Sequence, residues 1–250
     1  MKWIFCAAFF LSFVLTQAQL VNTEKLRKDK KEDGFSGEVS LNGSFLRNTR
    51  SIYRAGSFSR LEYRKAASRL MLFTSFNFSE ADKKSLVNNG YLHLRFNREL
   101  NDNLTLEAFS QVQYNQIQII RARMIQGIGP RFKLIQNDTL SMFVGSLYMY
   151  EYEEISDDLQ LNKHYRLSTY ISCGYAFSKT FSLDHITYYQ PRPDRFRDYR
   201  ILTETLLTFT LYQNLSFQFS FNLLFDSKPP DPTSIPESIY SIANGLSYTF

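Results

Sequence analysis

The sequence predicts an all-β fold, a transmembrane antiparallel β-barrel of about twelve strands in a single domain. Three observations predict it. Runs of about ten residues alternate apolar and polar side chains, the pattern of a strand with one apolar face. Short and longer connections alternate between these runs. Aromatic residues make up 16% of the chain although its mean hydropathy is -0.30, as in a wall that turns only alternate side chains toward lipid.

The first residues have the features of an export signal. Lys2 precedes an apolar run over residues 3–15, and residues 16–18 (TQA) offer small side chains for cleavage. A membrane-anchoring helix is the alternative, but the run is shorter than the roughly twenty residues that span a bilayer. We therefore expect a cleaved signal peptide over residues 1–18 and a location in the bacterial outer membrane.

The rest of the chain divides into a tail and a barrel. Residues 19–33 are polar and dense in charge, which predicts a periplasmic tail, and residues 34–250 form the predicted barrel. Cys6 lies in the signal, so Cys173 is the only mature cysteine and no internal disulfide is expected. The net charge of +5 is dispersed along an exported chain, which argues against a nucleic-acid partner.

Twelve alternating runs are the predicted strands. The eleventh is the clearest, because five phenylalanine or leucine side chains follow Leu215 at every second position. An even strand count suits a single-chain barrel with both termini on one side. The predicted strands are residues 35–45, 52–63, 69–78, 90–98, 104–114, 119–134, 140–152, 165–177, 181–190, 199–211, 215–225 and 238–250.

The connections indicate the orientation. Tight periplasmic turns are predicted at residues 65–68, 97–103, 135–139, 178–180 and 212–214. Longer outer loops are predicted at residues 79–89, 153–164, 191–198 and 226–237, with two short outer connections at 46–51 and 115–118. This asymmetry is typical of outer-membrane barrels.

Residues 106–154 resemble a known family. The motifs that carry the resemblance are residues 113–115 (QYN), the basic pair at 121 and 123, residues 127–131 (GIGPR), the turn at 137–138 (ND) and residues 150–153 (YEYE). The segment resembles domain of unknown function 481, an outer-membrane family often labelled salt-induced outer membrane protein. The family has no established activity, so the resemblance supports a barrel and implies no reaction.

An enzymatic role finds little support among the residues. His93 and His164 share strand faces with polar residues, whereas His185 shares the lipid face with Thr187. A nucleophile needs a base and an orienting third group, and no Asp or Asn faces this pair. We predict that the protein is not an enzyme and has no catalytic residue, no cofactor and no metal site. We predict that small residues such as Gly127 and Gly129 relieve crowding in the sheet.

The predicted lumen is rich in arginine. Reading the polar face of each strand gives the lumen-lining candidates Arg54, Arg60, Arg64, Arg95, Glu107, Arg121, Arg123, Arg131, Arg166, Arg200 and Glu204. Buried guanidinium groups must be paired or hydrated. They therefore either bond to inward carboxylates and plug the barrel, or line a wet path that favours anions.

Aromatic and basic residues predict the membrane interfaces. The expected outer girdle is Tyr148, Tyr150, Tyr152, Tyr188 and Tyr189, and the periplasmic one is Phe132, Tyr175, Phe177, Tyr212 and Phe250. Outer-membrane lipids are expected partners. Lipopolysaccharide phosphates are candidate ligands for Lys83, Lys84, Arg192, Arg195 and Arg197, against the alternative of solvated loops.

The final strand predicts one further partner. It looks like the C-terminal signal that outer-membrane assembly machinery reads, carried by Tyr240, Ile242, Leu246, Tyr248 and Phe250.

The sequence leaves four hypotheses about function. The first is an integral outer-membrane envelope protein or a narrow passive channel for small anionic solutes. The second is an envelope-stress barrel that interacts with lipopolysaccharide, and the third is a lipid-modifying enzyme. A soluble lipocalin-like carrier is the architectural alternative, with about eight strands and an apolar interior.

Overall fold

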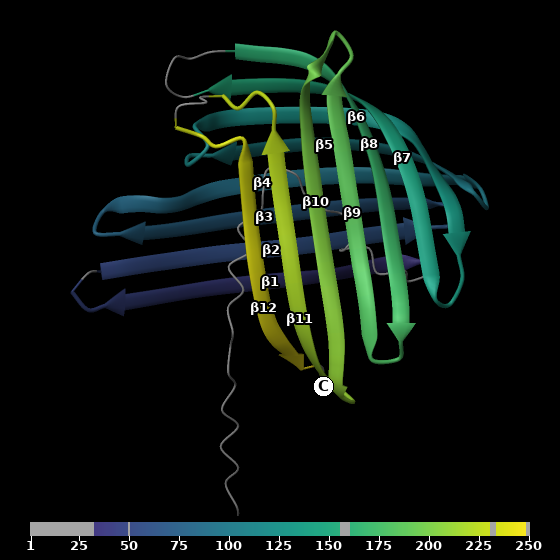
Figure 1. Ribbon diagram of the computed structural model, residues 1–250, viewed down its shortest axis with the longest axis horizontal. Helices are drawn as coiled ribbons and strands as arrows, with labels where there is room; N and C mark the ends of the chain where they lie inside the picture. The colour runs from purple at the N-terminus through teal and green to yellow at the C-terminus, as the bar shows by residue number, and fades with distance from the viewer. Residues whose placement is uncertain (1–32, 50, 156–160, 231–233, 249–250) are drawn as a thin grey trace, which may run out of the picture.

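The fold is a single antiparallel sheet in which each strand pairs with the next along the chain (Figure 1). The computed structural model describes residues 33–49, 51–155, 161–230 and 234–248. Within them the strands are β1 (Gly34–Arg47), β2 (Ser51–Lys65), β3 (Ser68–Ala81), β4 (Lys84–Asn101), β5 (Leu104–Asn115), β6 (Ile120–Gln136), β7 (Leu140–Ile155), β8 (Leu161–Ser178), β9 (Phe181–Arg192), β10 (Arg195–Tyr212), β11 (Leu215–Asp226) and β12 (Ser238–Tyr248).

The sheet coils strongly: in Figure 1, β1–β4 run across the view, whereas β9–β12 run from top to bottom. Its order is that of an up-and-down barrel. Hydrogen-bonded pairs join β1 through to β12, and among the described residues no pairing joins β12 back to β1. These residues also contain no helix that is long and apolar enough to cross a membrane.

All twelve predicted strands are present among the described residues, and several are longer than predicted. The expected loops at 79–89 and 191–198 are hairpins whose strands continue almost to the turn, because cross-strand hydrogen bonds hold polar segments that lack an apolar face. Most of the expected loop at 226–237 lies between strands, as predicted. The predicted signal peptide, Phe250 and almost all of the predicted tail lie outside the described residues.

The connections define two ends of the barrel. The turn end carries the connections β2–β3, β4–β5, β6–β7, β8–β9 and β10–β11, which are the predicted periplasmic turns. The loop end carries the others, including the segment between β11 and β12.

The two faces of the sheet differ as the alternation predicts. Along β7, Leu147, Met149 and Glu151 are buried on the inner face, whereas Tyr148 and Tyr150 are exposed on the outer face. The outer face carries exposed aliphatic and aromatic side chains on all but a few of its strands. The protein therefore has a packed interior inside an apolar outer surface, which is opposite to a soluble sandwich or carrier.

Glycines allow the inner face to pack closely. A Cβ at Gly129 would lie 2.1 Å from the backbone oxygen of Ser146, so only glycine fits where β6 approaches β7. At Gly127 and Gly145, a Cβ would instead lie 2.5 and 2.3 Å from ring atoms of Phe109 and Tyr170. The predicted role of Gly127 and Gly129 is thus supported by the geometry.

Candidate functional site: the barrel interior

An ionic cluster centred on Glu151 lies on the inner face at the loop end. One oxygen of its carboxylate accepts from Arg200 Nη1 at 2.5 Å and pairs with Arg123, and the other accepts from Arg166 Nε at 2.7 Å. Glu151 is 1% exposed and Arg123 is 0% exposed. Three guanidinium groups therefore share one carboxylate in a buried site.

Four further groups complete the Glu151 cluster. Arg200 also donates to Asp226 at 2.6 Å, and Arg166 to Asp198 at 2.9 Å. Glu153 lies 3.5 Å from Arg200. Arg192, at the end of β9, pairs with Asp198 at 3.0 Å. Positive and negative groups are thus nearly balanced, as burial of so many charges requires.

Some of these contacts cross the interior rather than follow the wall. Glu151 is on β7 and Arg200 on β10, with β8 and β9 between them. Neighbouring strands are about 4.8 Å apart. Side chains on β7 and β10 can therefore touch only by extending from the curved sheet into the interior. The Glu151 cluster therefore projects into the interior at the loop end, from β6 to β11.

A second ionic centre lies nearer the turn end. Glu107 is 0% exposed and accepts from Arg95 Nη2 at 2.5 Å and from the Tyr170 hydroxyl at 2.7 Å. Arg131 lies 3.7 Å from its other oxygen. Because Tyr170 is on β8 and Glu107 on β5, this contact also crosses the interior.

A layer of apolar side chains lies between the Glu151 cluster and the turn end. On β7 to β11 it consists of buried residues from neighbouring strands, and a separate apolar cluster on β3 consists of Met71 and Phe73, each 0% exposed. The ring of His93 stacks on Phe109 with centroids 5.4 Å apart, and its Nδ1 contacts Gln111 at 2.7 Å. The packed members on β7 to β11 are Leu147, Tyr170, Ile186, Tyr188, Leu202 and Leu224.

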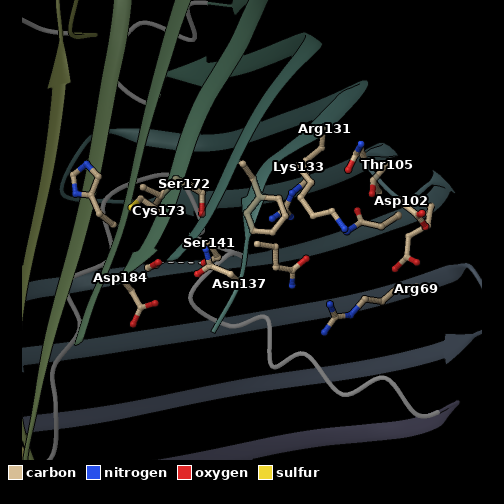
Figure 2. Close-up of a pocket in the computed structure, with 18 of the residues that line it drawn as sticks. Arg69, Asp102, Thr105, Arg131, Lys133, Asn137, Ser141, Ser172, Cys173 and Asp184 are labelled. Atoms are coloured by element: carbon tan, nitrogen blue, oxygen red, sulfur yellow. Dashed lines mark hydrogen bonds between the residues drawn. The ribbon is translucent and has the colours of Figure 1, made fainter. Parts of the chain in front are cut away.

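A cavity of about 970 Å³ occupies the turn end (Figure 2). Its lining includes residues of three turns at that end, such as Ala67, Asp102 and Asp138, so it is open there. On β9 to β11 the lining extends to Ile186, Leu206 and Asn222, and Ile186 also belongs to the apolar layer. We call this cavity the chamber.

The chamber is polar and carries charges of both signs. Figure 2 shows Arg69, Arg131 and Lys133 on one side and Asp184 on the other. Arg69 is held by Glu62 through two hydrogen bonds of 2.6 and 3.0 Å. Arg131 lies 3.9 Å from the centre of the Phe143 ring. The chamber can therefore hold water and small polar solutes that enter from the turn end.

The structure distributes the lumen candidates unevenly. Arg60, Arg95, Glu107, Arg123, Arg131, Arg166 and Arg200 are buried on the inner face, and Arg64 and Glu204 are half-buried in the chamber lining. Arg54 is exposed. Arg121 was wrongly placed in the lumen, since its side chain is 60% exposed and pairs weakly with Glu154 at 3.9 Å. The register of β6 against β7 shifts between Ile120 and Ala122, which turns Arg121 away from the face of Arg123.

Sequence reasoning missed the acidic residues that hold the cluster. Glu151 and Glu153 alternate with Tyr150 and Tyr152, so the period of two already placed them on the inner face. Tyr188 was also misplaced, because it is 8% exposed in the apolar layer rather than in an outer girdle. Among the described residues, no group of three or more His, Cys, Asp or Glu side chains could hold a metal ion.

His185 lies on the outer face, as predicted, and has partners that the sequence did not reveal. Its Nδ1 lies 2.9 Å from Thr205 Oγ1, and its Nε2 lies 3.0 Å from Thr187 Oγ1. Thr187 in turn contacts Thr203 at 3.0 Å. The two ring nitrogens are thus engaged in a chain of threonine hydroxyls.

A family model described as "Protein of unknown function, DUF481" matches residues 48–250. The chain belongs to this family. No curated protein matches it. Among solved structures, the DUF481 chain is similar to the NanC porin, with a TM-score of 0.50, 10% identity, and coverage of 84% of this chain and 100% of the porin.

Two further structural likenesses are to the KdgM porin. One structure shows the porin alone, with a TM-score of 0.43, 14% identity, and coverage of 86% of this chain and 98% of the porin. The other is titled as a complex with disordered oligogalacturonate, with a TM-score of 0.42, 12% identity, and coverage of 80% and 96%. The likeness to the NanC porin identifies the fold of the DUF481 chain as an antiparallel β-barrel.

Proposed function

We propose that the DUF481 chain is an integral outer-membrane barrel of the porin type with a sealed lumen, acting as an envelope protein rather than as an open pore. The observation that carries this proposal is the Glu151 cluster, whose contacts cross the interior, backed by the apolar layer. An open pore needs a continuous wet path, and the chamber opens at the turn end while the Glu151 cluster lies toward the loop end.

Membrane placement is supported by two aromatic bands on the outer face. Near the loop end, Tyr148 and Tyr165 stack at 5.3 Å, and near the turn end Phe181 stacks on Phe177 and Phe209 at 4.5 Å each. On β8, Tyr165 and Tyr175 are ten positions apart. At about 3.3 Å per residue and a tilt of about 40°, this gives roughly 25 Å, the height of the apolar band of outer-membrane barrels.

A second candidate function is a narrow passive channel for small polar solutes, which the notable size of the chamber favours. The similarity of the fold to that of a porin also supports this candidate. Swelling of proteoliposomes in small sugars and organic anions separates the two candidates. The sealed barrel predicts swelling no faster than in protein-free liposomes, whereas size-dependent swelling supports the channel.

The depth of His185 argues against a lipid-modifying enzyme. It lies four positions from Phe181 and four from Tyr189, at the middle of the band between the aromatic girdles. Ester bonds of membrane lipids lie near the interfaces, so the Thr187 hydroxyl would be placed away from them. The hydrolase hypothesis predicts acyl hydrolysis that is lost in His185→Ala, and the sealed barrel predicts none with either protein.

Two histidines provide a test of the membrane placement. We expect His185→Leu to leave the free energy of unfolding in bilayers unchanged or raised, because a lipid-facing polar group in mid-membrane gives way to an apolar one. His93→Leu is the matched change on the inner face. It should cost about 1–3 kcal/mol, because the buried Gln111 loses its partner. Urea unfolding followed by heat-modifiable gel migration measures both, and a large loss in His185→Leu alone would contradict the placement.

A further inference from the structure

Exposed cations lie next to the tyrosine girdle at the loop end. Tyr165 contacts both Tyr148 and Tyr150, each at 5.3 Å between ring centroids, and all three face outward. Two positions closer to the loop end, Lys163 is exposed on the same face of β8. Its Nζ lies 5.8 Å from the centre of the Tyr152 ring, so the ammonium group sits directly beyond the girdle.

Arg121 lies on the same rim. Its side chain is 60% exposed, and its nearest acidic oxygen, on Glu154, is 3.9 Å away, beyond hydrogen-bonding distance. Glu154 pairs in register with Ala122 on β6 and with Leu161 on β8. Lys163 pairs in register with Tyr152, two positions from Glu154 on β7, so this carboxylate is outnumbered by the two cations and the group has a net positive charge.

The β9–β10 hairpin carries two further exposed cations, and a third cation whose charge is already paired. Arg195 and Arg197 are exposed. Arg192 is instead engaged by Asp194, through bonds of 2.6 and 3.1 Å, and by Asp198 at 3.0 Å. The Arg192 guanidinium holds the pKa of the Asp194 carboxyl below its usual value. Both groups therefore stay charged and paired with each other.

We propose that Arg121, Lys163, Arg195 and Arg197 form a basic rim that binds the phosphate groups of lipid headgroups. Tyrosine girdles lie at the level of the headgroups, so cations directly beyond them reach the depth of lipid phosphates. Phosphate oxygens form strong charge-assisted hydrogen bonds with arginine and lysine. This proposal depends on the membrane placement and not on whether the lumen is sealed.

The test is lipid binding by the purified protein, measured by native mass spectrometry. The probe is a diphosphorylated lipid A, with its dephosphorylated form as the comparison lipid. We expect the wild type to prefer the phosphorylated lipid, and the double variant Lys163→Glu/Arg197→Glu to need at least about tenfold more of it for half occupancy, since each basic group near the surface contributes about 1 kcal/mol.

The matched control is Lys65→Glu/Lys179→Glu. It makes the same change of charge at two exposed positions of the turn end, at the opposite end from Tyr148, Tyr150 and Tyr165. It should bind like the wild type. Equal losses in both variants would show a response to net charge alone and overturn the site, as would no loss in the rim variant. Competition by millimolar inorganic phosphate would overturn the lipid as the source of the phosphate.

Discussion

Glu151→Ala is expected to destabilise the barrel by about 3–5 kcal/mol, because it leaves three buried guanidinium groups without their shared partner. Arg123 would lose the most electrostatic stabilisation, since it is 0% exposed and the carboxylate of Glu153 is 3.6 Å away. The loss is measured as the free energy of unfolding in urea, with the heat-modifiable gel shift as the readout of folded barrel.

Glu154→Ala is the matched control, because this residue lies on the same strand but faces outward and its ion pair with Arg121 is long and exposed. We expect a change within about 0.5 kcal/mol, as for most exposed ion pairs. Glu151→Gln separates charge from shape, since an amide keeps the size but cannot neutralise Arg166 and Arg200. Similar stability of Glu151→Gln and the wild type would contradict the electrostatic role of Glu151.

Gly129→Ala is expected to be the most damaging single-methyl addition on the inner face. Its Cβ would lie 2.1 Å from the oxygen of Ser146 and 2.6 Å from the Cα of Leu147, both backbone atoms that can move only if β6 and β7 separate. We expect a loss of about 3 kcal/mol, at the upper end of overpacking costs, seen as less folded barrel in refolding yields and a lower urea midpoint.

Gly43→Ala adds the same methyl group where there is room. The nearest atom to its Cβ is a backbone oxygen 3.8 Å away, and its strand β1 is exposed. Its stability should equal that of the wild type or exceed it slightly, because alanine reduces the freedom of the unfolded chain. If both variants behave alike, the close approach of β6 and β7 at Gly129 is not a constraint on the fold.

The strands were predictable because a period of two is a local property of the sequence. The run that begins at Leu215 shows it most clearly. Strand ends were less predictable, because the hairpin that starts β4 at Lys84 is held by backbone pairing and has no apolar face. The prediction for Arg121 was wrong for a related reason. An irregularity in the register of β6 changes which side chains face inward, and the residue types there do not indicate it.

The interior contacts were beyond sequence reasoning for a different reason. The pattern shows that Glu107 and Tyr170 both face inward, but strand order alone does not place their side chains in contact across three strand spacings. The same holds for Glu151 and Arg200. The inward orientation of Glu151 was itself predictable, since outward-facing tyrosines occupy both neighbouring positions. It was the pairing of charges across the interior that required the structure.

Single-channel recording in planar bilayers tests the sealed lumen most directly. The wild-type protein is inserted after its folded state is verified by heat-modifiable migration, and an open porin recorded under the same conditions calibrates the membrane. The sealed barrel predicts no conductance steps in wild-type membranes at any moderate voltage, because in this proposal the Glu151 cluster and the apolar layer close the interior beyond the chamber. Reproducible steps comparable to those of the open porin would contradict it.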